Sequence, residues 1–139
     1  MSATAETYKP MVKPSLRSAV PTFLVPDVAK TARWYEANLG FTFSPHPKSE
    51  PYVYASLRRE GAEVMLLSME GYKKEEISRT GGNWDAYIRM EGVREFYEEV
   101  RQRVPVRMEL VRQPYGDWEF EVSDPNGYVL VFGGDGETG

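Results

Sequence analysis

Apolar and polar positions along the chain follow one pattern twice. In the first copy, an apolar run at 20–25 predicts a strand, and Asp27 can cap a helix that follows it. Apolar residues at spacings of 4, 7 and 11 then predict one face of that helix, which Gly40 ends. These residues are Val28, Ala32, Tyr35 and Leu39. Strands are predicted next at 41–43, 52–59 and 62–69.

The second copy begins after Gly81-Gly82. A strand is predicted at 85–90, and the helix after it repeats the same apolar spacing until Pro105 ends it. Its apolar face consists of Val93, Tyr97, Val100 and Val104. Further strands are predicted at 107–112, 118–122 and 128–132, the last two separated by the turn sequence Asp124-Pro125-Asn126-Gly127.

The two copies are offset by 65 residues in their helices and by 66 after the first hairpin, where Gly61 corresponds to Gly127. Each copy reads strand–helix–strand–strand–strand, and neither half can close a core alone. We therefore predict a single α+β domain over 18–134, with modules at 18–70 and 83–134 and a linker at 71–82. Residues 1–17 are predicted to be a flexible arm, or alternatively a segment that docks on a partner subunit, and 135–139 a loose tail.

Composition removes several kinds of chemistry. The 139 residues include no cysteine, which excludes disulfides and thiolate metal sites, and His46 is the one histidine in the sequence. The net charge of −4 argues against a nucleic-acid partner. No apolar run approaches the ~20 residues of a membrane span, and the start lacks the apolar core of a signal peptide, so a cytoplasmic location is predicted.

Two groups of motifs carry a resemblance to a known family. Near the start they are Pro26-Asp27-Val28 and Leu39-Gly40-Phe41, and near the end Tyr115 to Phe120 and Asp124 to Tyr128. In this order, and within a repeated module, they resemble the vicinal oxygen chelate superfamily, which includes glyoxalase I, extradiol dioxygenases and the fosfomycin and bleomycin resistance proteins. The resemblance implies two βαβββ modules whose eight strands form an open, cup-shaped mixed sheet with helices on the outside.

The resemblance also implies where a metal would bind. Metal-using members take one ligand from the first and one from the last strand of each module, which here are Val20, Met65, Asp85 and Val131. Valine cannot ligate, and a methionine thioether is too soft for the divalent ions concerned. The chain therefore resembles the metal-free, bleomycin-resistance-like branch, and neither a metal nor another cofactor is predicted.

Strand alternation sorts side chains by sheet face. Phe120 and Ile88 belong to the apolar set that packs under the helices, whereas Glu119 faces the cup. The predicted ligand-binding residues are Tyr52, Tyr54, Met65, Asp85, Tyr87, Arg89, Glu119 and Glu121. A register slip of one residue would exchange the two sets, and a simply hydrated sheet face would also explain the charges.

An aromatic and acidic cup suits a flat organic molecule that bears an amine. We therefore favour a small-molecule binding protein, forming a homodimer. The alternatives are a metal-dependent lyase, isomerase or dioxygenase of the same fold, and a metal-free enzyme with Glu119, Glu121 or a tyrosine as general base.

Overall fold

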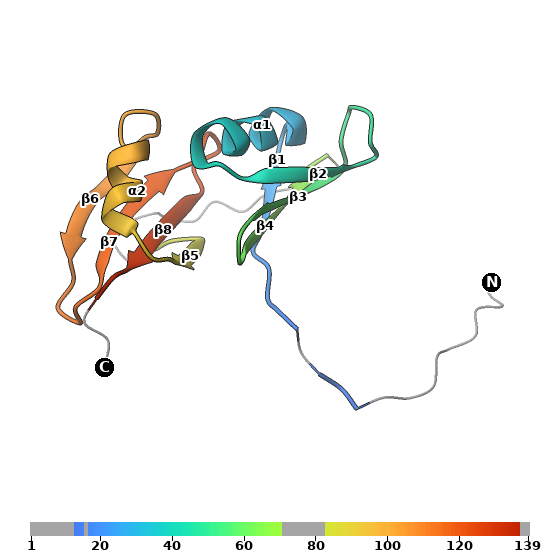
Figure 1. Cartoon of the computed structure of the whole chain (residues 1–139). Coiled ribbons are helices and arrows are strands. Elements are labelled where there is room, and N and C mark those ends of the chain that lie inside the picture. The colour runs from blue at the N-terminus through green and yellow to red at the C-terminus, as the bar shows by residue number, and fades with distance from the viewer. Residues whose placement is uncertain (1–12, 16, 71–82, 137–139) are drawn as a thin grey trace.

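Two helices and eight strands follow one another in the repeated order that the sequence predicts. The computed structural model describes residues 13–15, 17–70 and 83–136 (Figure 1). The elements are β1 (Thr22–Val25), α1 (Val28–Leu39), β2 (Thr42–His46), β3 (Tyr54–Arg59), β4 (Ala62–Ser68), β5 (Ala86–Arg89), α2 (Val93–Val100), β6 (Val106–Arg112), β7 (Trp118–Ser123) and β8 (Val129–Gly134). The predicted linker and most of the predicted N-terminal arm lie outside the described residues.

The eight strands form two four-stranded mixed sheets. Their orders are β1-β4-β3-β2 and β5-β8-β7-β6, with β1/β4 and β5/β8 parallel and the other pairs antiparallel. The register repeats between the sheets, since Tyr54 pairs with Leu67 as Glu119 pairs with Gly133. The α+β class and the internal repeat are thus confirmed. The described strands form two hydrogen-bonded sheets, with β1 and β5 each at an edge, and no single eight-stranded sheet.

Helix α1 begins and ends at the predicted residues. The Asp27 carboxylate accepts a hydrogen bond from the backbone N–H of Lys30 at 3.0 Å, which satisfies one of the free donors at the helix start. Gly40 takes the left-handed conformation that ends the helix, with φ of 74°. This position also needs a glycine because the Arg59 guanidinium lies over it.

Helix α2 is shorter than predicted, and its capping residue lies far from it in the sequence. It ends at Val100, and the chain then tightens so that the N–H of Arg103 bonds to the Val100 carbonyl. At its start, the Asp135 carboxylate accepts hydrogen bonds from the N–H groups of Gly92 and Val93. Asp135, predicted to begin a loose tail, therefore caps α2.

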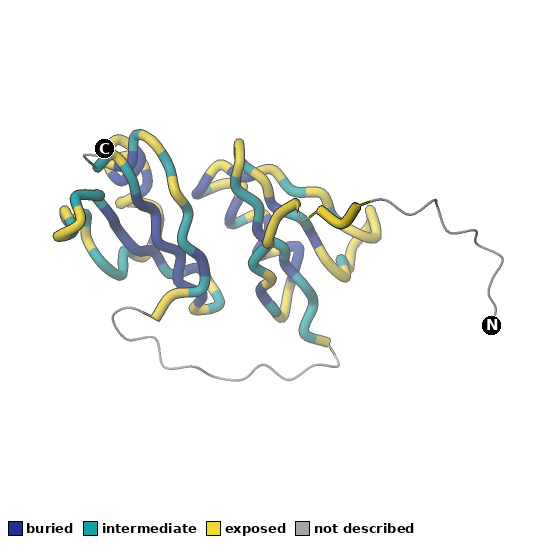
Figure 2. Tube along the Cα trace, turned by 90° about the horizontal axis from the view of Figure 1, so that it is seen from below, coloured by how far each residue is buried: buried dark blue, intermediate teal, exposed yellow. Residues whose placement is uncertain are grey.

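The core of each module lies between its helix and one face of its sheet. Figure 2 shows buried residues in both modules. In the second module, Phe120 is fully buried and contacts Phe96 and Tyr97 of α2. Glu119 follows the opposite face of the same strand. The predicted register of β7 is therefore correct, and yet Glu119 is also buried on its own face, at 2% exposed.

The two modules of the chain pack against each other through reciprocal contacts. The turn between β7 and β8 contacts α1, where Tyr35 donates a hydrogen bond to Asp124 at 2.7 Å and Phe23 stacks on Tyr128. In the corresponding place, Arg59 of the β3–β4 hairpin lies over the ring of Phe96 in α2, 5.1 Å from its centroid. Each module thus presses its last hairpin onto the helix side of the other.

In the described part of the chain, neither helix has the length and apolar character that crossing a membrane requires.

Candidate functional site

A cluster of polar side chains lies on the face of the second sheet that points away from α2. Glu119 of β7 is at its centre, with Tyr87 of the edge strand β5 on one side. Tyr115, in the hairpin between β6 and β7, approaches the same carboxylate. We call Tyr87, Tyr115 and Glu119 the tyrosine–glutamate cluster. All three residues belong to the second module, where β8 lies between β5 and β7, so the fold of that module alone positions these groups.

Both phenols of the cluster donate to one carboxylate oxygen. The hydroxyl groups of Tyr87 and Tyr115 each lie 2.5 Å from Oε2 of Glu119. Burial and then the bond to Glu119 raise the pKa of Tyr87. For Tyr115 the bond to Glu119 is the larger cause, and it raises the pKa to about 12. Both phenols are therefore firmly protonated donors at neutral pH.

Gly133 makes room for this arrangement. It pairs with Glu119 in the neighbouring strand β8, and a Cβ atom placed on it would lie 2.2 Å from the Tyr87 hydroxyl. A distance below 3.0 Å is essentially never seen for a real Cβ atom. The bond between Tyr87 and Glu119 therefore requires a residue without a side chain at position 133.

Glu121, the second predicted carboxylate on this strand, is already neutralised. Arg107 of β6 lies 3.3 Å from it, and both side chains are largely buried. The pairing of β6 with β7 shifts between Val106 and Met108, the stretch that contains Arg107. Glu119, in contrast, forms no ion pair with any described residue, so the buried negative charge of the cluster is balanced by neutral donors alone.

The other predicted site residues lie apart from the cluster or at its rim. Arg89 lies over the ring of Tyr87 and 3.9 Å from Asp117, with most of its side chain exposed. The Asp85 carboxylate accepts the N–H of Val129 and so joins β5 to β8.

Three predicted residues belong to the first module. Tyr54 stacks on His46, which lies at the end of β2, and Met65 pairs with Thr22 on the corresponding sheet. Tyr52 precedes β3 and packs with Phe43 against the core, because strand alternation does not extend to it.

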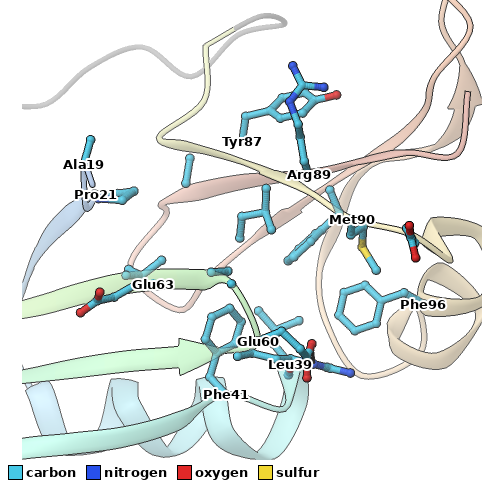
Figure 3. A pocket seen from close by; sticks show the side chains of 18 residues that line it. Ala19, Pro21, Leu39, Phe41, Glu60, Glu63, Tyr87, Arg89, Met90 and Phe96 are labelled. Carbon is cyan, nitrogen blue, oxygen red and sulfur yellow. Dashed lines mark hydrogen bonds and ion pairs between the residues drawn. The ribbon is translucent and has the colours of Figure 1, made fainter. Parts of the chain in front are cut away.

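A cavity of about 790 Å³ lies between the two modules, beside the cluster. Residues of both modules line it; in Figure 3 the side chains of Met90 and Phe96 lie on the side of the first module, whereas those of Tyr87 and Arg89 project from the opposite side of the chain. Much of its lining is apolar. It includes Phe41 and Phe132, and also Ile88, which the sequence assigned to the face under the helices. Tyr87 connects this cavity with the tyrosine–glutamate cluster.

The four positions that would hold a metal in metal-using relatives do not fit a divalent ion. Val20 and Val131 carry no donor atom, and the Asp85 carboxylate is engaged with the Val129 N–H. Within the described residues, no three His, Asp or Glu side chains lie close enough together to hold a metal ion. The absence of a metal from the native protein stays a prediction.

Sequence reasoning missed three residues of the site. Tyr115 sits in a hairpin, where strand alternation gives no direction, although it belongs to a motif that the sequence singles out. Arg107 lies beside a register shift, and Gly133 matters only through the space it leaves. The available signal was the acidic residue between two aromatic ones on β7, from which the sequence predicted that Glu119 lies on the face opposite to Phe120.

Comparison with known proteins agrees with this fold. A family model described as the Glyoxalase/Bleomycin resistance protein/Dioxygenase superfamily matches residues 18–132. No curated protein sequence matches the chain.

Solved structures of low sequence identity share the fold. TioX from Micromonospora sp. ML1 is similar with a TM-score of 0.67 and 19% identity, over 82% of this chain and 94% of that one. A glyoxalase-related enzyme from Clostridium phytofermentans has a TM-score of 0.68 and 18% identity, over 86% of this chain and 95% of that one. A superfamily member from Sphaerobacter thermophilus has a TM-score of 0.65 and 22% identity, over 84% of this chain and 97% of that one.

Proposed function

Because the chain belongs to the glyoxalase/bleomycin resistance protein/dioxygenase superfamily, we propose that it binds an aromatic organic molecule bearing an amine, in a site without a metal ion. The binding site is the tyrosine–glutamate cluster together with the adjoining wall of the cavity. The protein acts by holding its ligand, as the drug-binding resistance proteins of this fold do.

The observation that carries the proposal is the state of Glu119. Glu119 is 2% exposed, and its carboxylate has no cationic partner among the described residues. A buried carboxylate without a counter-ion is costly, and neutral donors offset that cost in part. A ligand that brings a positive charge to Glu119 completes the compensation through a charge-assisted hydrogen bond.

Aromatic side chains beside Glu119 supply the contact for a ring. Trp84 lies 6.0 Å from Tyr87 between ring centroids and is 43% exposed, so its indole is available for stacking. Tyr87 also forms part of the cavity wall. A flat ligand can therefore lie against these rings while its amine reaches the carboxylate.

The proposal is tested with a panel of aromatic amines, namely benzylamine, phenethylamine and tryptamine, titrated against the protein by NMR and isothermal calorimetry. We expect the Glu119→Gln substitution to raise the Kd by about tenfold to a hundredfold, because a hydrogen bond to a charged group contributes roughly 1.5–3 kcal/mol. The matched control is Glu98→Gln, which removes a charge from the exposed face of α2. An equal Kd for wild type and Glu119→Gln, or no binding by any amine, contradicts the proposal.

We also propose that the protein is a homodimer. Large apolar side chains remain exposed in the described chain, at Val53, Trp84 and Val111 among others. Sedimentation velocity at tens of micromolar checks this, and a monomer at that concentration contradicts it.

A further inference from the structure

Tyr115 combines two properties that rarely occur together. Its side chain is 64% exposed, whereas its hydroxyl ends on a carboxylate that is 2% exposed. Tyr115 therefore lies on the solvent side of Glu119, with much of its own surface exposed. Any molecule that approaches Glu119 from this side meets Tyr115 first.

The backbone beneath Tyr115 is fixed, so its side chain can move without the hairpin. The N–H of Gln113 bonds to the carbonyl of Asp117 at 2.8 Å, and the N–H of Gly116 bonds back to the Gln113 carbonyl at the same distance. Arg112 adds a bond to the Gly116 carbonyl. Rotation about the side-chain torsions of Tyr115 is then sufficient to uncover the carboxylate.

The second phenol of the cluster is held more firmly. Tyr87 lies on a strand, under the guanidinium of Arg89 and beside Trp84, and its hydroxyl fills the space left by Gly133. Of the two donors on Oε2, Tyr115 is therefore the one that an incoming group displaces.

We propose that Tyr115 occupies the place of the ligand's amine, and that the ligand is a primary arylalkylamine whose ammonium N–H group replaces the Tyr115 hydroxyl on Glu119. This inference rests on the proposed function. It adds that the ligand donates an ammonium N–H to Glu119 and that the Tyr115 hydroxyl competes for the same carboxylate. The site is closed by its own phenol until a stronger donor arrives.

The chemistry of the exchange defines which amines are accepted. An ammonium N–H carries a full positive charge to the carboxylate, whereas the phenol is neutral, so the exchange strengthens the bond. A quaternary ammonium has the same charge but no N–H group, and it cannot take the place of the hydroxyl. The site therefore discriminates between amines by their ability to donate.

The experiment compares two probes of equal charge and ring, benzylamine and benzyltrimethylammonium, on the whole chain. Their Kd values are measured by NMR titration, following the Glu side-chain carboxyl carbons, for wild type and for the Tyr115→Phe, Glu119→Gln and Tyr115→Phe/Glu119→Gln variants. Tyr97→Phe is the matched control, because Tyr97 is a tyrosine of α2, which packs on the other face of the second sheet from Glu119. Thermal unfolding of each variant checks that it is folded.

Removing the competing hydroxyl should improve binding, since the fraction of open sites limits the apparent affinity. We expect Tyr115→Phe to bind benzylamine roughly tenfold more tightly than wild type, Tyr97→Phe to equal wild type, and Glu119→Gln to abolish the gain. Wild type should prefer benzylamine to benzyltrimethylammonium.

Two results overturn the inference in distinguishable ways. If Tyr115→Phe binds benzylamine equally or more weakly while Glu119→Gln still weakens binding, Tyr115 is a contact residue and the proposed function stands. If neither wild type nor Tyr115→Phe binds benzylamine, or if the Kd for benzylamine is the same with and without Glu119, the proposed function fails. This inference then fails with it.

Discussion

Three tyrosine hydroxyl groups of this protein each donate a hydrogen bond to a carboxylate. Tyr35 bonds to Asp124, while Tyr87 and Tyr115 share Glu119. Burial is the first cause that raises the pKa of Tyr35 and of Tyr87, and the carboxylate bond is the first cause for Tyr115. Deprotonating any of them would place a phenolate against a carboxylate.

This arrangement predicts a loss of stability at alkaline pH. In the unfolded chain these tyrosines titrate near pH ~10, and in the folded chain at higher pH, because their pKa values are raised. The folded state then binds more protons, so the free energy of unfolding falls as the pH rises above ~10 and continues to fall toward the Tyr115 pKa of about 12. Urea unfolding at successive pH values measures this fall.

Glu119→Gln provides the comparison, because it removes the acceptor of two of the three phenols. The variant should show a shallower loss of stability between pH ~9 and ~11 than wild type. Parallel curves for the two proteins would mean that the Glu119 bonds do not set the pKa values.

A second prediction concerns Gly133. An alanine there should lower the free energy of unfolding by about 1–3 kcal/mol, because its methyl group meets the Tyr87 hydroxyl. Ultraviolet titration of the tyrosines should also show one group returning toward its ordinary pKa. Gly61→Ala is the control, since nothing lies within 4 Å of a Cβ atom at that position. If the two variants are equally stable, the space at position 133 is not what the Tyr87–Glu119 bond depends on.

At the scale of elements, how well each helix could be predicted depended on whether its capping groups lie next to it in the sequence. Helix α1 carries its signals locally, at Asp27 and Gly40, and its bounds were predicted to the residue. Helix α2 begins after Gly92, which has no side chain, and takes its cap from Asp135 beyond the last strand. A contact across so many residues leaves no local pattern, so the sequence could not indicate it.

The Asp135→Ala substitution should therefore destabilise the second module. We expect a loss of about 0.5–2 kcal/mol in the free energy of unfolding, the usual range for an N-cap. Hydrogen exchange should accelerate at the N–H groups of Gly92 and Val93 more than elsewhere. Asp27→Ala is the matched control for a helix capped by its own segment, and there the faster exchange should appear in α1. Unchanged exchange at Gly92 and Val93 would show that Asp135 is dispensable.

At the scale of the whole molecule, the repeat predicted two modules but could not predict how they meet. Alternation correctly assigned Phe120 to the core and Glu119 to the other face, since the period of a strand is read directly from the sequence. The cavity between modules was missed because Phe41 and Phe132 are buried in their own module and also face the gap. Periodicity describes the inside of a module, and it carries no information on the packing of one module against another.

The packing of the modules depends on the buried bond between Tyr35 and Asp124. Tyr35→Phe should lower the free energy of unfolding by about 1.5–3 kcal/mol, because it removes one donor from a buried carboxylate. Asp124 keeps two backbone donors, from Asn126 and Tyr128, so the fold should survive. Chemical denaturation measures the loss, with Tyr54→Phe as the control on an exposed tyrosine. A loss no larger than that of the control would mean that the bond does not hold the modules together.

The repeated register also shows how two copies of one module have diverged. The positions of Tyr87, Glu119 and Gly133 are occupied in the first module by Thr22, Tyr54 and Leu67. In the first copy the large side chain is Leu67 on the fourth strand, and in the second copy it is Tyr87 on the first strand. Because a Cβ atom at position 133 would meet the Tyr87 hydroxyl, we expect the tyrosine at 87 and the glycine at 133 to vary together among related proteins.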